Sequence, residues 1–204
     1  MKLRLSPRLA LVVITMIFLL PLAAAWLMYS GVIEFQPVST KNLGHLVQPP
    51  LPVDRGMLAA VGESPDPAGE LDEHWGIVYD LPADCEAECL QAVIALRQVH
   101  RASGRNQSRL RLLLLMPERW PAELEQNLRS IYPAFLLATD PSGEFQASLK
   151  EVASGLSPGS EGKGNTYLLD PLGNIMMYYE AGSDPNNLKK DLKRLLTWSK
   201  LDEQ

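Results

Sequence analysis

The first long hydrophobic stretch of the chain runs from Leu9 to Tyr29 and contains no charged residue. Its length matches the roughly 20 residues that a helix needs to cross a bilayer. Three cations and no acidic residue precede it. By the positive-inside rule, we expect a cytoplasmic N-terminus over residues 1–8, one transmembrane anchor over residues 9–30 and an exported remainder.

A cleaved signal peptide is the alternative interpretation of this stretch, because Ala23, Ala24 and Ala25 resemble a cleavage site. The apolar stretch is longer than an ordinary signal core and continues past the alanines, which favours an uncleaved anchor. Both interpretations export the rest of the chain.

Residues 31–70 show no regular hydrophobic period and are rich in proline and glycine. This composition predicts a stalk, with one short strand near residues 56–61. We therefore expect the folded exported domain to occupy residues 71–204.

From Trp75 onward, strand-like and helix-like hydrophobic patterns alternate. Residues 75–80 are β-branched and aromatic, which predicts a buried strand. Apolar residues three or four positions apart then predict a helix between an N-cap at Asp84 and a stop at Gly104. The remaining segments predict strand 108–117, helix 121–132, strand 134–140, helix 145–155, a hairpin over 165–182 and helix 184–198. This order predicts an α/β domain whose central mixed sheet has helices on both faces.

The charge of the exported part argues against one class of partner. Without Lys2, Arg4 and Arg8, the chain has 16 basic residues against 24 acidic ones, a formal charge of −8. Binding to nucleic acid needs clustered cations, so we expect no nucleic-acid partner.

Cys85 and Cys89 are the only cysteines, and they lie where the first predicted strand gives way to the first helix. A helix N-terminus stabilises thiolates, whereas the carboxylates of Asp84, Glu86 and Glu88 raise thiol pKa values. If both residues are helical, their Cβ atoms lie roughly 5–6 Å apart, which is wider than a disulfide allows. This spacing suits a metal clamp better, and thiolates select soft ions such as Cu(I). A structural disulfide, a redox pair and a metal site all remain open.

The CxxxC pair at a strand-to-helix junction, followed late in the chain by YLLDPLGNI (residues 167–175), resembles the Sco/SenC branch of thioredoxin-like proteins. The resemblance covers roughly residues 70–200. It implies a thioredoxin-like fold and a role in building the copper centre of cytochrome c oxidase. It also implies that Cys85 and Cys89 are the reactive thiols or copper ligands.

One departure from the Sco pattern concerns the third copper ligand. Sco proteins place a histidine before the late strand, where this chain has SEGKGNTY, with Gly162 near that position. His100 lies about 16 Å along the helix axis from Cys89. We expect His74 at the far end of the first strand and His45 in the stalk. Met176 and Met177 offer thioethers, one expected on each face of their strand.

The sequence therefore predicts a single-pass protein of the bacterial inner membrane with a periplasmic thioredoxin-like domain. The resemblance implies a role in cytochrome c oxidase assembly, with oxidase subunits or assembly factors as partners. The mechanism is either thiol–disulfide exchange or copper handling by Cys85 and Cys89. A scaffold that keeps the fold without the chemistry is the alternative function.

Overall fold

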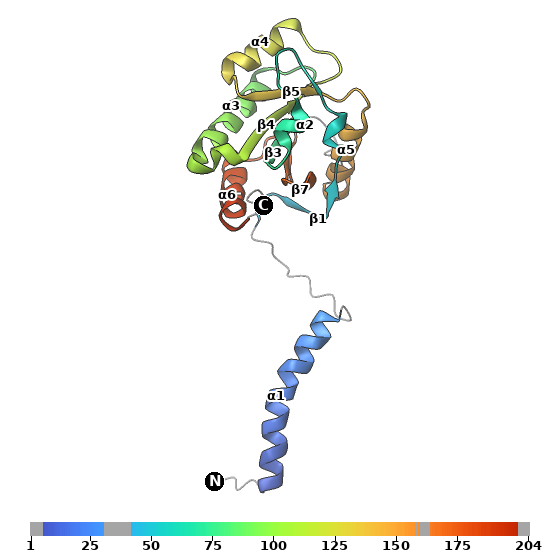
Figure 1. The fold of residues 1–204 in the computed structure, drawn as a ribbon, viewed down its shortest axis with the longest axis vertical. Helices are drawn as coiled ribbons and strands as arrows, with labels where there is room; N and C mark the ends of the chain where they lie inside the picture. The colour runs from blue at the N-terminus through green and yellow to red at the C-terminus, as the bar shows by residue number, and fades with distance from the viewer. Residues whose placement is uncertain (1–5, 31–41, 158, 160–163, 200–204) are drawn as a thin grey trace. The chain divides into compact units, whose positions relative to one another are not determined.

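The computed structural model describes residues 6–30, 42–157, 159 and 164–199 (Figure 1). The chain divides into two units, residues 1–41 and residues 42–204. Residues 1–5 and 31–41, which include most of the expected cytoplasmic end and the start of the expected stalk, lie outside the described residues.

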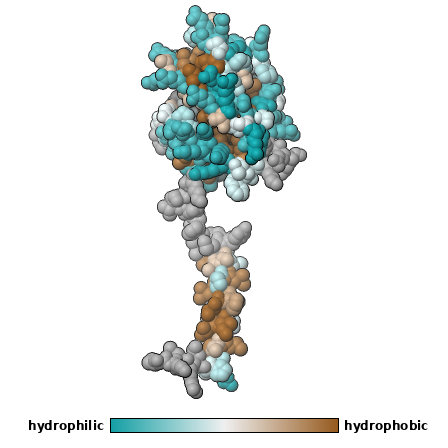
Figure 2. Space-filling view, turned by 90° about the vertical axis from the view of Figure 1, so that its left-hand side faces the viewer, coloured by the Kyte–Doolittle hydropathy of each residue, from teal (hydrophilic) through white to brown (hydrophobic). Residues whose placement is uncertain are grey.

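The first unit contains one helix, α1 (Pro7–Tyr29), which is long and apolar enough to cross a membrane. Ser6 caps the helix, since its side chain accepts a hydrogen bond from the Leu9 N–H, and Pro7 occupies the first helical position. Figure 2 shows the apolar side chains as a brown band along the helix. The expected apolar helix is confirmed, and it fits a membrane anchor.

The second unit is built on a seven-stranded mixed sheet with the order β1-β7-β6-β3-β4-β5-β2. Its strands are β1 (His45–Pro52), β2 (Ala59–Ala60), β3 (Trp75–Asp80), β4 (Leu110–Leu115), β5 (Phe135–Thr139), β6 (Thr166–Leu169) and β7 (Asn174–Tyr179). β3, β4 and β5 run parallel, and the other pairings are antiparallel. All six residues of β3 are buried, as the continuous apolar pattern predicts for a central strand.

Helices cover both faces of this sheet, which confirms the predicted layers (Figure 1). The main helices are α3 (Ala87–Ala102), α4 (Ala122–Ile131), α5 (Glu144–Leu156) and α6 (Pro185–Trp198). The shorter ones are α2 (Pro67–Leu71) and the 3₁₀ turns η1 (Arg55–Met57) and η2 (Gly104–Arg109). Buried side chains of α3, α4 and α6 share one hydrophobic cluster, and those of α5 belong to a second cluster on the opposite face.

The expected stalk is corrected for residues 42–70, which belong to the folded domain. β1 pairs with β7, and β2 extends the other edge of the sheet beside β5. Pro49 and Pro50 interrupt the pairing between Leu46 and Leu51, because proline has no N–H to donate. The proline-rich pattern that predicted a stalk therefore reflects an irregular edge strand.

A β-bulge corrects the expected placement of the two methionines. Leu168 pairs with Met177 and Leu169 pairs with Ile175, so Met176 is an extra residue in β7. Both methionines consequently pack against the same hydrophobic cluster, with Met177 fully buried and Met176 partly buried. The alternation that would have placed them on opposite faces fails at the bulge.

Asp191 fastens the first residues of the domain to α6. Its Oδ2 accepts hydrogen bonds from the backbone N–H groups of Leu43 and Gly44, at 2.8 and 3.0 Å, and from the Tyr179 hydroxyl at 3.0 Å. The Arg194 guanidinium lies 3.5 Å from Oδ1. Burial raises the pKa of Tyr179, and the Asp191 carboxylate raises it further, so the tyrosine remains a donor.

We predict that Asp191→Ala destabilises the domain by about 3 kcal/mol, because one buried and two partly buried donors lose their acceptor. Chemical denaturation of residues 42–204 measures this free energy of unfolding. Arg194→Gln is the matched control and should change it by about 0.5 kcal/mol or less, since the arginine is half exposed. Equal losses in the two variants would contradict the role assigned to the buried carboxylate.

Candidate functional site

Cys85 and Cys89 form a disulfide, with their Cα atoms 5.1 Å apart. α3 begins at Ala87, with Glu86 as its N-cap, so Cys85 lies outside the helix. The expected N-cap at Asp84 is therefore wrong. Because Cys85 precedes α3, its backbone is not constrained to helical geometry. The disulfide therefore forms without distortion of the first helical turn.

Backbone pairing at the end of β3 positions the disulfide. The Leu81 N–H donates to the Leu115 carbonyl at 3.0 Å, which carries the sheet one residue beyond β3. The Gly164 N–H donates to the Asp80 carbonyl at 2.7 Å, and the Asp80 N–H donates to the Asn165 carbonyl at 3.0 Å. The segment that leads into β6 therefore lies against the end of β3, five residues before the first cysteine.

Asn165 links this segment to a third loop. It is 2% exposed, and its side-chain oxygen accepts a hydrogen bond from the Ala181 N–H at 2.9 Å. The loop after β7 and the segment before β6 are thus joined at the same end of the sheet as the disulfide. Three separate parts of the chain can therefore contribute residues to a site at this end of the sheet.

The two sulfurs occupy different environments. Cys89 is 8% exposed and belongs to the cluster beneath α3, whereas Cys85 is only partly buried and packs at the edge of that cluster. Cys85 is therefore the more exposed cysteine of the pair, and Cys89 is the sheltered one. Accessibility of this kind decides which sulfur exchanges with a partner.

Opposing charges act on the pair when it is reduced. The side chain of Glu86 makes no capping hydrogen bond, which leaves the first-turn N–H groups of α3 without a side-chain partner. These groups and the positive end of the helix dipole favour a thiolate. The carboxylates of Asp84, Glu86 and Glu88 are exposed and oppose this effect through solvent, where screening weakens them.

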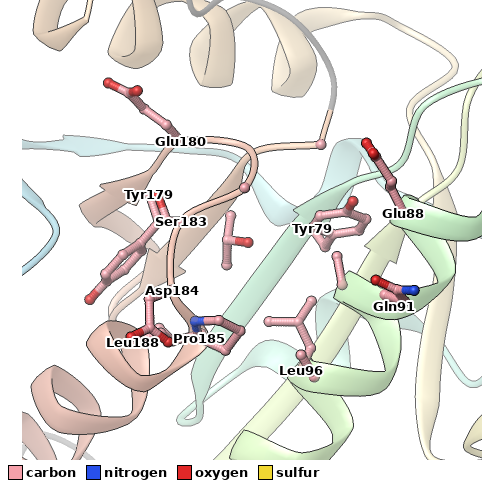
Figure 3. Close-up of a pocket in the computed structure, with 15 residues that line it drawn as sticks. Tyr79, Glu88, Gln91, Leu96, Tyr179, Glu180, Ser183, Asp184, Pro185 and Leu188 are labelled. Atoms are coloured by element: carbon pink, nitrogen blue, oxygen red, sulfur yellow. The ribbon is translucent and has the colours of Figure 1, made fainter.

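A cleft of about 580 Å³ lies at this end of the sheet (Figure 3). It runs between the first half of α3 and the start of α6, with the ends of β3, β6 and β7 as its floor. Glu88, which directly precedes Cys89, and Glu180 face it from opposite sides. Burial, with Asp80 nearby, raises the pKa of Tyr79 to about 12, so this floor residue stays neutral.

The histidines do not complete a metal site with the cysteines. His100 is buried at the far end of α3, where Nδ1 lies 3.0 Å from the Tyr132 hydroxyl and Nε2 lies 3.3 Å from the Leu110 carbonyl. His74 precedes β3 at the end opposite the disulfide, as predicted, and contacts Arg111. His45 is corrected from the stalk to β1, where its Nε2 lies 3.5 Å from Glu180.

The donor set does not fit a three-ligand copper site within the described residues. That part of the chain contains no cluster of three or more His, Cys, Asp or Glu side chains able to hold a metal. Gly162, which stands near the position of the Sco histidine, lies outside the described residues. Reduction of the disulfide supplies two sulfur donors.

Tyr79 and Asn165 are site residues that the sequence did not reveal. By sequence alone, Tyr79 is one more aromatic residue of a predicted buried strand, and Asn165 is typical of a turn before a hairpin. Only the register that places Tyr79 opposite Thr166, and Thr166 opposite Tyr179, brings these segments together.

We predict that iodoacetamide modifies Cys85 at least about tenfold faster than Cys89 after full reduction, because only the first sulfur is accessible. Mass spectrometry of a short alkylation time course measures both rates. The single variants Cys85→Ser and Cys89→Ser assign each rate. Faster alkylation of Cys89 would contradict the assignment of Cys85 as the reacting sulfur.

We predict that protonation of His100 destabilises the domain, since burial lowers the pKa of this imidazole below its usual value of 6.5. Below about pH 6.5, the unfolded chain binds a proton that the folded domain resists, so stability falls as pH falls. Denaturation between pH 8 and pH 5 should show this loss, and His100→Gln should flatten the profile. Parallel profiles for the two proteins would contradict the prediction.

Comparison with protein families gives one match. The model described as "Transmembrane-like, thioredoxin-like, C-terminal domain" matches residues 75–199, which confirms the predicted thioredoxin-like fold. No curated protein has a sequence that matches the chain significantly.

Several solved structures resemble the chain. Copper-bound yeast Sco1 is 18% identical, covering 63% of this chain and 82% of its own, with a TM-score of 0.49. Copper-bound ScoI of Arabidopsis thaliana is 18% identical, with coverages of 64% and 89% and a TM-score of 0.48. BsSco, described as a Sco-family cytochrome c oxidase assembly protein with a disulfide switch, is 15% identical, with coverages of 79% and 99% and a TM-score of 0.47. These are similarities of structure at low sequence identity, and the thioredoxin-like fold rests on the family match over residues 75–199.

Proposed function

The chain belongs to the transmembrane-like, thioredoxin-like family, and we propose that it is a membrane-anchored thiol–disulfide exchange protein acting through Cys85 and Cys89. The observation that carries this proposal is the unequal burial of the two disulfide-bonded sulfurs at the start of α3. An accessible sulfur beside a sheltered one supports exchange with a partner followed by internal resolution.

A purely stabilising role for the disulfide is less favourable on energetic grounds. It closes a loop of only five residues, and the loop-entropy model assigns such a loop about 2 kcal/mol, against about 4.7 kcal/mol for a loop of 100 residues. The domain also has a hydrophobic cluster on each face of its sheet. The cross-link therefore adds little stability, which leaves its chemistry as the better reason for its position.

The exchange proceeds in two balanced steps. In the reduced protein, the Cys85 thiolate attacks one sulfur of a partner disulfide, and the partner's other sulfur leaves as a thiolate that takes up a proton. The Cys89 thiol then loses its proton and attacks the Cys85 sulfur. This closes the Cys85–Cys89 bond and releases the partner's second thiolate, so two electrons pass from the pair to the partner. The same steps in reverse oxidise a partner dithiol.

The compartment follows from the anchor and from the chemistry. The positive N-terminal flank supports a cytoplasmic position for residues 1–8 and a position on the periplasmic side of a bacterial inner membrane for residues 42–204. A disulfide persists in that compartment, whereas the cytosol would reduce it. Both considerations support an exported redox domain.

Cytochrome c oxidase subunits or assembly factors are the proposed partners. Support comes from the resemblance of the CxxxC pair and the late hairpin to Sco/SenC proteins, and from the solved Sco proteins that share the fold. Copper binding by the reduced pair would need a further donor, from a partner or from outside the described residues. Thiol exchange needs no further donor, so it is the function that we place first.

We predict that Cys85→Ser and Cys89→Ser each lower oxidase activity in cells that lack the native protein, and that the double variant is no worse than either single variant. The two single variants and the double variant should lose the same amount of oxidase activity, because exchange requires both sulfurs. Ser142→Ala, at an exposed turn before α5, is the control and should retain full activity. A fully active double variant would leave only the scaffold function.

Titration of the reduced protein with Cu(I) in the presence of a competing chelator separates the two mechanisms. If the protein acts by exchange, we expect wild type and Cys85→Ser to compete equally weakly with the chelator for Cu(I). Tight stoichiometric binding that is lost in Cys85→Ser would instead establish copper handling as the role of the pair.

A further inference from the structure

The outward face of α6 carries a cationic stripe that ends in an exposed tryptophan. Lys190, Arg194 and Trp198 follow one another at four-residue steps, and Lys189 and Lys193 precede them around the helix, so the five side chains spread over about half of the circumference of α6. All five are exposed, and Trp198 is 84% exposed. On a domain with a net negative charge, this face is locally basic.

Two depressions flank the second half of this helix. One, of about 320 Å³, lies between α6, the end of α3 and η2, and its charged lining is Arg105, Lys189 and Lys193. The other, of about 350 Å³, includes Trp75, Met176 and Trp198. The Trp75 indole N–H is buried without a hydrogen-bond acceptor among the described residues. A basic hollow and an aromatic hollow therefore lie on either side of α6.

The chain enters the domain at this same surface. Asn42 lines the aromatic depression, and Asp191 of α6 accepts hydrogen bonds from the next two backbone N–H groups. Only eleven residues, 31–41, separate Ser30 from Asn42. Fully extended, they span at most roughly 40 Å, so this part of the domain cannot move far from the end of the anchor.

We propose that α6 docks on the anionic phospholipid headgroups of the membrane that holds the anchor. The lysines and Arg105 match phosphate groups in charge, and an exposed tryptophan beside cations is typical of a side chain that inserts at a membrane interface. The short connection favours the lipid surface over a soluble partner, because it holds this surface permanently at high local lipid concentration.

Docking would orient the redox site, a consequence that rests on the proposed function. The starts of α3 and α6 line the cleft, at Glu88 and Pro185, and the last residue of α3 and the later turns of α6 line the basic depression, so the two helices run in the same direction. The 16 residues of α3 span about 24 Å between these ends. With the second half of α6 on the lipid surface, the disulfide lies about one helix length from that contact, where a partner can reach it.

Lysine acetylation of the full-length protein in nanodiscs tests the docking. One set of discs contains phosphatidylcholine alone, and the other contains phosphatidylcholine with phosphatidylglycerol. We expect acetylation of Lys189, Lys190 and Lys193 to slow at least about threefold on the anionic discs, and high salt to remove this protection. Lys150 of α5, exposed on the opposite face of the sheet, is the internal control and should react equally on both discs.

The triple variant Lys190→Gln, Arg194→Gln and Trp198→Ser should make the acetylation of Lys189 and Lys193 independent of lipid charge, whereas Lys150→Gln should leave the protection intact. An unchanged Lys150 rate and melting temperature show that the triple variant is folded. Equal lysine rates on both kinds of disc would overturn the proposal. Protection that follows protein concentration rather than lipid charge would overturn it in favour of contact between two copies. Cysteine alkylation in the same samples reports on the redox pair separately, so a failure of docking is distinguishable from a failure of the proposed function.

Discussion

The pairing of β3 on both of its edges is the constraint on which the rest of the domain depends. β4 runs parallel along one edge through six consecutive pairs, from Trp75 with Leu110 to Asp80 with Leu115, and β6 runs antiparallel along the other. With both faces of β3 also buried, its end is fixed in three dimensions. The disulfide follows that end within five residues. The position of the two cysteines is therefore set by β3, which is constrained on both edges and both faces.

Next to the end of β3, the fold places the two cysteines in different environments, as the proposed thiol exchange requires. The start of α3 places one sulfur in the core and leaves the other at its edge. The loops before β6 and after β7, joined through Asn165, complete the same end of the sheet. The opposite ends of α3 and α6 carry the basic surface and the entry of the chain from the anchor. The disulfide and the basic surface thus lie at opposite ends of the same pair of helices.

Much of the domain could be predicted from hydrophobic period, because strands β3 to β5 and helices α3 to α6 bury continuous or amphipathic patterns of ordinary length. β1 could not, since its prolines are characteristic of loops, and only pairing with β7 holds it in the sheet. The methionine bulge is likewise a property of the register between two strands and not of either sequence. A helix capped at Asp84 disfavours the disulfide, because both cysteines would then be helical. A difference of two residues at that helix end, where Glu86 is the cap, decides whether the sulfurs can meet.

The reduction potential of the Cys85–Cys89 pair tests the central claim most directly. It can be measured by equilibrating the purified full-length protein with defined ratios of reduced and oxidised glutathione and trapping free thiols. A reversible exchange site predicts a potential above about −300 mV, within reach of glutathione and of exported thiol proteins. A potential clearly below that value would identify a structural disulfide and contradict the account.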